Sequence, residues 1–183
     1  MGILMRRWQR GVTAFALMLA CAAAQAQGAP SEATVKAAFL YKFAGYVEWP
    51  ASAFPQPDAP LVIGVVGADE VAAELEKLLP GRQVNNRRVV ARRVREGEPL
   101  RGIHLLFVGR GERDLRAALR AAQQQGVLAV SEAERGLELG SAINFVVVDD
   151  RVGFEVSLDS AERSGIRISS RMLAVARRVI PRS

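Results

Sequence analysis

The chain has 183 residues, of which 50% are hydrophobic, 24% charged and 6% aromatic, with 25 basic and 19 acidic side chains. This is the composition of a globular domain with a core, and it excludes collagen-like, low-complexity and disulfide-dense chains. Only one apolar stretch approaches the length of a membrane span, and it lies at the N-terminus, which excludes a polytopic membrane protein.

The N-terminus has the pattern of an export signal. Three arginines come first, namely Arg6, Arg7 and Arg10. An apolar run over 12–24 follows and leads into a small-x-small cleavage site. We therefore expect a signal peptide over 1–26, cleaved after Ala26, and a single mature domain over 27–183. An uncleaved membrane anchor and a lipoprotein acylated at Cys21 are the alternatives.

The mature part has little excess charge and no cysteine. Removing three Arg and no acidic residue lowers the net charge from +6 to +3, which is not the footprint of a nucleic-acid-binding protein. The only cysteine is Cys21, so the mature chain has no disulfide, thiolate metal site or cysteine nucleophile. The densest basic run, over 87–95, alternates with valines. It indicates a strand with a solvated face, with an anion-binding patch as the alternative.

The first mature element is an apolar helix, expected over 33–47 and ended by Trp49-Pro50. It is apolar nearly all round, so it is either deeply buried or paired with a partner. Six of the nine mature aromatic residues fall between 39 and 54, and aromatic side chains with a polar tip are favoured at interfaces. The candidates for a partner surface or for the core are Phe39, Tyr41, Phe43, Tyr46 and Trp49.

The middle of the chain alternates apolar strands with amphipathic helices. We expect strands over 61–66, 103–108 and 126–130, and helices over 68–79, 112–124 and 132–139, the last capped by Ser131. Continuous apolar strands that alternate with helices indicate a mostly parallel sheet covered on both faces.

The pattern changes near the C-terminus. Two β-type runs over 142–148 and 152–158 flank Asp149-Asp150-Arg151, which predicts a hairpin and makes the sheet mixed. A short helix over 160–164 and a last helix over 171–180, ended by Pro181, complete the chain. The predicted fold class is α/β: a three-layer α/β/α sandwich with a mostly parallel mixed sheet and a C-terminal β-hairpin.

The sequence offers little for catalysis. His104 is the only histidine and stands inside an apolar strand, which favours a structural role. Without a second histidine or a mature cysteine, we expect no transition-metal site. The turn Gly109-Arg110-Gly111 resembles a phosphate loop, but Asp114 stands where the third glycine would be. We therefore expect no catalytic residue, no metal and no cofactor.

A polar group opens the last expected helix. It consists of Ser169, Ser170 and Arg171. Free amides, serine hydroxyls and a guanidinium could together hold a small anion. The alternative is a surface arginine beside an ordinary N-cap.

Two segments together resemble the YfiR-like family of periplasmic regulators. They are residues 35–50 (VKAAFLYKFAGYVEWP) and residues 166–176 (IRISSRMLAVA), and shorter segments between them match in order. The resemblance implies an α/β fold, a periplasmic location and a regulatory rather than catalytic role. The best-known members bind the periplasmic domain of an inner-membrane diguanylate cyclase and repress it, which lowers cyclic di-GMP and biofilm formation. The resemblance also implies a possible homodimer.

Two other functions compete with this one. The first is a periplasmic small-molecule binding module for an anionic ligand, serving a transporter or a sensor kinase. The second is an enzyme of Rossmann-like architecture, against which the single histidine and the broken glycine motif count.

Family members often carry a cysteine just before the histidine of the 103–108 strand. Ile103 stands there in this chain, so we do not expect disulfide-based redox control.

Overall fold

The computed structural model describes residues 29–182. The expected signal peptide and its cleavage site lie outside the described residues. Within 29–182, no helix is both long enough and apolar enough to cross a bilayer.

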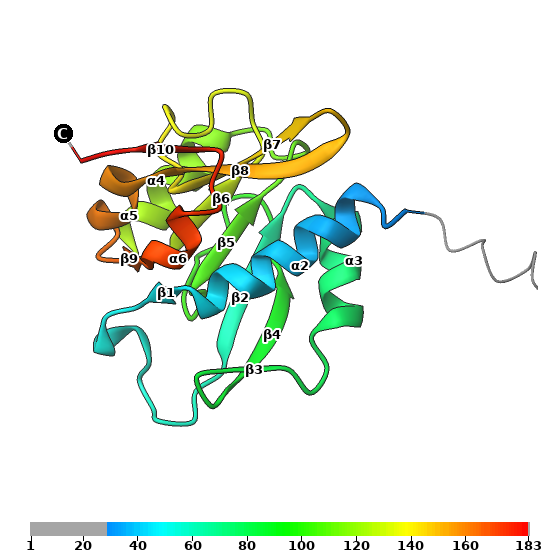
Figure 1. Ribbon diagram of the computed structural model, residues 1–183. Helices are drawn as coiled ribbons and strands as arrows, with labels where there is room; N and C mark the ends of the chain where they lie inside the picture. Colours follow the sequence, from blue (N-terminus) through cyan, green and yellow to red (C-terminus); the bar gives the residue numbers. More distant parts are fainter. Residues whose placement is uncertain (1–28, 183) are drawn as a thin grey trace, which may run out of the picture. The chain divides into compact units, whose positions relative to one another are not determined.

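An eight-stranded mixed sheet forms the centre of the domain (Figure 1). Its strands are β2 (Leu61–Val66), β3 (Gln83–Val84), β4 (Arg87–Arg93), β5 (Leu105–Val108), β6 (Leu128–Ser131), β7 (Ile143–Val148), β8 (Arg151–Ser157) and β10 (Arg178–Ile180). Their order across the sheet is β10-β8-β7-β6-β5-β2-β4-β3. All neighbours are parallel except β7 with β8 and β3 with β4. The prediction of a mostly parallel mixed sheet with a C-terminal hairpin is confirmed.

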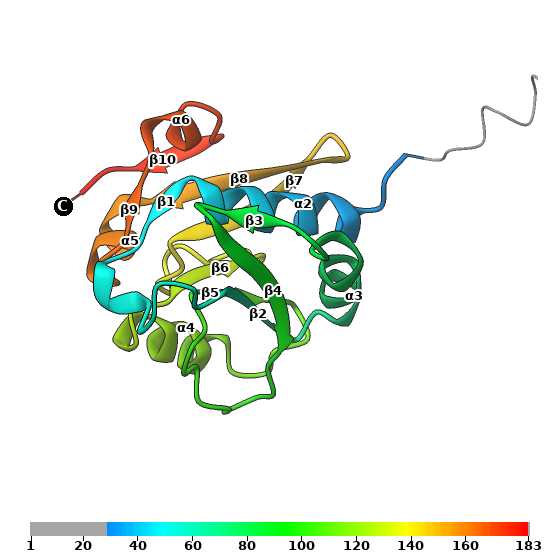
Figure 2. The same ribbon diagram turned by 90° about the horizontal axis from the view of Figure 1, so that it is seen from below.

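Helices cover the sheet on both faces. Figure 2 shows α2 (Glu32–Gly45) and α3 (Asp69–Leu78) on one face and α4 (Leu115–Gln124) on the other. Side chains that alternate along β5 separate two cores. Leu105 and Phe107 pack into the cluster beneath α2 and α3, whereas Leu106 and Val108 pack into the cluster beneath α4. The three-layer sandwich is confirmed.

The position of α2 explains why that helix is apolar nearly all round. It lies across the sheet in Figure 1, and it contacts α3 and β8 as well as the strands beneath it. Its buried residues are Ala33, Lys36, Ala37, Leu40, Phe43 and Ala44. Burial inside the domain therefore accounts for most of its apolar surface.

Short elements link the two ends of the domain. The helix expected over 33–47 ends at Gly45, and the chain continues as β1 (Val47–Glu48), which pairs with β9 (Arg167–Ile168) in a separate two-stranded sheet. A 3-10 helix, Ala51–Ala53, follows β1. The short helix expected near residue 160 is α5 (Leu158–Arg163), and its first turn is capped by the preceding serine.

The helix expected over 132–139 is wrong, because this segment forms turns. Ser131 is the last residue of β6 rather than an N-cap, and its hydroxyl donates to Oδ1 of Asn144 at 2.5 Å. The backbone of Gly136 packs on this pair so closely that a Cβ there would lie 2.0 Å from the Ser131 hydroxyl oxygen. We attribute the turns to this close packing.

The helix expected over 171–180 is also wrong. The helix is only α6 (Ser170–Leu173), and β10 follows it as an extended strand. The amide of Arg177 donates to the carbonyl of Phe154 at 2.9 Å, and β10 then pairs with β8. The free edge of β8 supplies backbone hydrogen bonds to this segment, and this tertiary pairing overrides the helical pattern of the sequence.

The predicted turn between β7 and β8 is confirmed. Asp149 and Asp150 have positive φ angles of 51° and 56°, as a two-residue type I′ hairpin requires. Asn85 and Asn86 have the same conformation, with φ angles of 50° and 63°, in the turn between β3 and β4. In both turns a short polar side chain tolerates the left-handed region.

Candidate functional site

The two ends of the domain meet at the small sheet formed by β1 and β9. Val47 pairs with Ile168 and Glu48 with Arg167, and the amide of Ser169 donates to the carbonyl of Tyr46 at 2.9 Å. The segments 35–50 and 166–176, which lie more than a hundred residues apart, are therefore side by side at this small sheet.

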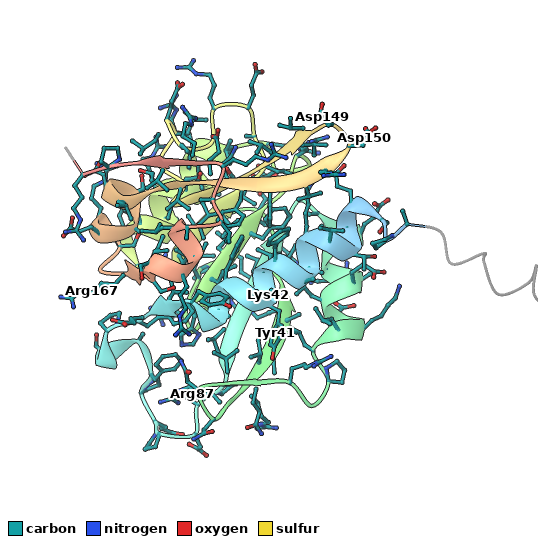
Figure 3. The ribbon with its side chains drawn as sticks, in the orientation of Figure 1. Tyr41, Lys42, Arg87, Asp149, Asp150 and Arg167 are labelled. Carbon is teal, nitrogen blue, oxygen red and sulfur yellow. The ribbon has the colours of Figure 1, made fainter. Side chains whose placement is uncertain are left out.

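We define the junction surface by its exposed side chains: Lys42, Tyr46, Glu48, Arg167 and Arg171. Three of them are cationic and one is acidic, so the surface carries an excess of positive charge. Tyr46 is 41% exposed. Figure 3 shows Lys42 on α2 and Arg167 extending outward at the left of the view. An aromatic residue among cations is suited to binding an acidic protein surface.

One of the five aromatic candidates lies in the interior, and Phe39 is half-buried against the same core. The Phe43 ring is 2% exposed and lies 4.9 Å from the Phe154 ring and 5.7 Å from the Phe145 ring, between centroids. Phe39 is half-buried, and its ring lies 5.6 Å from that of Phe154. Of the two predicted roles, core or partner surface, burial gives Phe43 the core role.

Tyr41 and Trp49 are half-buried and hold neighbouring segments in place. The Tyr41 hydroxyl donates to the carbonyl of Gln83 in β3 at 3.1 Å. The indole Nε1 of Trp49 donates to the carbonyl of His104 at 3.3 Å. Tyr46 is thus the most exposed of the five candidates, whereas Tyr41 bonds to β3 and Trp49 to the backbone just before β5.

His104 is structural, as the sequence predicted. Its Nδ1 accepts from the amide of Val62 at 3.1 Å, which places the proton on Nε2, and Nε2 donates to the carbonyl of Ala53 at 3.0 Å. The Phe54 ring stacks on the imidazole at 4.4 Å, and the Arg87 guanidinium lies 4.0 Å from the Phe54 ring on top. Both ring nitrogens are therefore occupied by backbone groups.

The environment of His104 keeps the ring neutral. Burial lowers the pKa of His104 below its ordinary value of 6.5, and the nearby charge of Arg87 acts in the same direction. The hydrogen bond to the Ala53 carbonyl opposes the shift but does not reverse it. These two hydrogen bonds suit the neutral imidazole, because protonation of Nδ1 would remove its bond with the Val62 amide.

Ser169, Ser170 and Arg171 lie at the junction surface. The Ser169 hydroxyl accepts from the amide of Met172 at 3.4 Å and acts as the N-cap of α6. Ser170 and Arg171 are exposed. Because α6 is only four residues long, its dipole contributes little to anion binding. The geometry gives Ser169 the capping role and leaves Arg171 as a surface cation.

The glycines after β5 serve backbone packing. The amide of Gly111 donates to the carbonyl of Gly67 at 2.9 Å, and that of Gly109 donates to the carbonyl of Val66 at 2.8 Å. A Cβ at Gly109 would lie 2.4 Å from the Gly67 carbonyl oxygen. The loops after β2 and β5 therefore touch each other through their backbones, which accounts for the glycines without a phosphate.

A partly buried charge cluster around Lys36 was not predicted from the sequence. This side chain, on an otherwise apolar helix, forms ion pairs with Glu32 and Glu132. The Nε of Arg110 lies 3.7 Å from the Glu132 carboxylate, and the Arg110 amide donates to the same carboxylate at 3.1 Å. The hydrogen bond from Lys36 holds the pKa of Glu32 below its ordinary value. A lysine four residues after a glutamate, on a helix that is apolar nearly all round, was the available signal.

A cavity of about 380 Å³ lies beside this cluster, near the ends of β2, β5 and β6. Its walls carry two cations, Lys36 and Arg110, against four carboxylates, those of Glu32, Asp69, Glu70 and Glu132. This balance does not favour an anionic ligand. Among the described residues, no group of three or more His, Cys, Asp or Glu side chains is arranged to hold a metal ion.

Comparisons with known proteins agree with this architecture. The model of a family described as YfiR/HmsC-like matches residues 33–177, which is most of the described chain. A crystal structure of a conserved domain protein from Vibrio cholerae O1 biovar El Tor str. N16961 is similar, with a TM-score of 0.53 and 13% sequence identity. The similarity covers 81% of this chain and 60% of the Vibrio chain, and at this identity it supports the fold alone.

Proposed function

The chain belongs to the YfiR/HmsC-like family, and from this premise we propose that it is a periplasmic protein that represses an inner-membrane diguanylate cyclase. In this proposal it binds the periplasmic domain of the cyclase and lowers the production of cyclic di-GMP, and with it biofilm formation. Binding requires no catalytic group in this chain.

The observation that carries the proposal is the junction surface. The two segments that resemble the family most closely, 35–50 and 166–176, meet at the β1–β9 sheet and expose Tyr46 with three cations. The buried residues of the same segments, Phe43 and Met172 among them, fix the backbone beneath that surface. An exposed aromatic residue and three cations on these paired segments are suited to an acidic partner surface.

Repression follows from a difference in affinity between two partner states. A cyclase that exchanges between an active and an inactive conformation is held inactive by a protein that binds the inactive one more tightly. A preference of about 100-fold, or about 3 kcal/mol, shifts a balanced equilibrium to about 99% inactive at saturation. Anything that weakens the junction contact restores the cyclase.

The test uses charge reversal on the junction surface. Tagged mature protein is produced in the periplasm, membranes are solubilised gently, and co-purifying proteins and cellular cyclic di-GMP are measured. We expect the wild type to retain a membrane cyclase. Arg167→Glu and Tyr46→Ala should each weaken retention about tenfold or more and raise cyclic di-GMP.

Arg116→Glu is the matched control. Arg116 is an exposed arginine on α4, across the sheet from α2, so its reversal changes the net charge by the same amount. It should leave retention and cyclic di-GMP unchanged, and circular dichroism should show that all three variants are folded. Failure of the wild type to retain any cyclase contradicts the proposal and favours the small-molecule module. Equal effects of Arg167→Glu and Arg116→Glu would contradict the location.

A further inference from the structure

The crossover between β4 and β5 contains no helix. Residues 94–104 form a loop, whereas the crossover from β5 to β6 contains α4. The face of the sheet opposite α2 is therefore covered by α4 and this loop (Figure 2). A cavity of about 330 Å³ lies between them.

The cavity walls are mainly apolar and small. They include Val66 and Leu106 from adjacent parallel strands and Val94 and Leu100 from the loop. The α4 wall is formed by three alanines, namely Ala117, Ala118 and Ala121. The short alanine side chains leave the space open, and its volume falls at the small end of the range of ligand sites.

The cavity lies where the order of the strands reverses. The chain passes from β2 to β4 on one side of β2 and then crosses to β5 on the other. Val66 is the last residue of β2, and Glu112 follows the end of β5. In open α/β sheets, ligands bind beside the carboxyl ends of the strands at such a point. Here the turns after β2 and β5 are in backbone contact, and the open space lies between α4 and the 94–104 loop.

The rim of the cavity is acidic although the chain as a whole is basic. Four carboxylates line it, from Glu96, Glu98, Glu112 and Asp114, against the single cation of Arg95. Three of the four have local partners, Glu112 among them. Asp114 caps α4 by accepting from the Ala117 amide at 2.9 Å. Glu98 accepts from the Arg95 amide at 3.0 Å and lies 3.9 Å from the Arg92 guanidinium.

Glu112 lines the cavity together with the alanines of α4. It is half-buried, and one of its oxygens accepts from the Asp114 amide at 3.0 Å. We propose that this cavity binds a small organic cation, with its apolar body among the alanines of α4 and its ammonium group beside Glu112. The charge of the rim selects the cation, and the volume selects a molecule of about one ring. This site is distinct from the junction surface, which lies across the sheet.

The test probe is 2-phenylethylammonium, with 3-phenylpropionate as the anion of similar size. Binding to the mature protein is measured by calorimetry, and its location by methyl shifts of the alanines in nuclear magnetic resonance spectra. We expect saturable binding of the cation, at least about tenfold tighter than that of the anion. The largest shifts should be those of Ala117, Ala118 and Ala121.

Two variants separate charge from shape. Glu112→Gln keeps an oxygen for the Asp114 amide and should weaken cation binding about threefold or more. Glu134→Gln, an exposed residue that does not line the cavity, is the matched control and should have no effect. Ala118→Leu fills the cavity and should abolish binding. No saturable binding of the cation, or equal binding of cation and anion, overturns the proposal. If Ala118→Leu does not fold, unchanged cation binding by Glu112→Gln also overturns it.

Discussion

The two faces of the central sheet are packed with different kinds of side chain. The face beneath α2 and α3 contains a cluster of phenylalanines, namely Phe39, Phe43, Phe107, Phe145 and Phe154. The buried core beneath α4 consists of Val, Leu, Ile and Ala side chains, and an open cavity lies against it. Large aromatic rings fill the space under a helix that crosses the sheet. Small side chains under one helix and a loop leave room.

The largest expected effect comes from truncating the aromatic core. Phe43→Ala should lower the free energy of unfolding by about 3–5 kcal/mol, because it leaves a ring-sized hole among packed rings. Leu119→Ala, in the buried core beneath α4, should cost less, because the neighbouring loop can relax into the space. Urea unfolding of both variants measures the difference. An equal or larger loss for Leu119→Ala would contradict this account of the two faces.

The buried ion pairs of Lys36 should give the next largest effect. Lys36→Met leaves the largely buried Glu132 carboxylate with only the exposed Arg110 as an ionic partner and should cost about 3 kcal/mol. The double variant Lys36→Met/Glu132→Gln should recover part of this loss, because it removes the buried charge of Glu132. Glu32→Gln serves as the control and should cost less than about 1 kcal/mol, since that side chain is 46% exposed. A double variant no more stable than Lys36→Met would show that the charge balance is not what matters.

The buried, hydrogen-bonded environment of His104 predicts a dependence of stability on pH. Because the folded state lowers the pKa of His104, the unfolded chain binds this proton first as the pH falls through 6.5. The contribution to stability is full above 6.5 and declines below it, by at most about 1.4 kcal/mol per pH unit, until the folded state is protonated too. Urea unfolding at several pH values measures the decline.

His104→Gln is the matched control for the pH experiment. Glutamine can donate to the Ala53 carbonyl but does not titrate, so the variant should be less stable at neutral pH and lack the decline just below 6.5. The glutamates with lowered pKa values, Glu32 among them, affect stability only below their ordinary value of 4.5. A decline of the same size in His104→Gln would assign it to other groups.

The smallest expected effect is a gain at the β7–β8 hairpin. Asp150 has a φ angle of 56°, which glycine adopts without steric cost. Asp150→Gly should therefore raise the free energy of unfolding by about 0.5 kcal/mol, since Asp-Gly suits a type I′ turn. Thermal unfolding measures the gain, with Asp58→Gly, in the loop before β2, as a control for loss of charge. A loss of stability in Asp150→Gly would show that the aspartate side chain holds the turn.

Local sequence patterns predicted the elements that depend on local chemistry. The apolar strands β2 and β5 and the Asp149-Asp150 turn follow from runs of side chains and from turn residues, and all three were predicted. The failures came from long-range contacts. The segment 171–180 pairs with the edge of β8, and Gly136 packs on a buried polar pair that only the folded sheet creates.

For the candidate site, too, local features were predicted from the sequence and long-range contacts were not. The sequence identified the aromatic helix and the polar group at Ser169, but it did not show that β1 and β9 would bring them together. It also did not separate core rings from surface rings. Phe43 and Tyr46 are three residues apart, yet Phe43 is almost completely buried and Tyr46 is exposed, because α2 ends between them at Gly45. The ion pair between Lys36 and Glu132 could not be predicted from the sequence, because the two residues lie 96 positions apart.

The most direct test of the proposed junction surface is site-specific photo-crosslinking in intact cells. A photoreactive amino acid replaces Tyr46 on the junction surface in one strain and Arg116 on α4 in another, and crosslinked products are identified by mass spectrometry. We expect a crosslink to the periplasmic domain of a membrane diguanylate cyclase from position 46 and none from position 116. Crosslinks from position 116 alone, or a failure of position 46 to reach any membrane protein, would contradict the proposal.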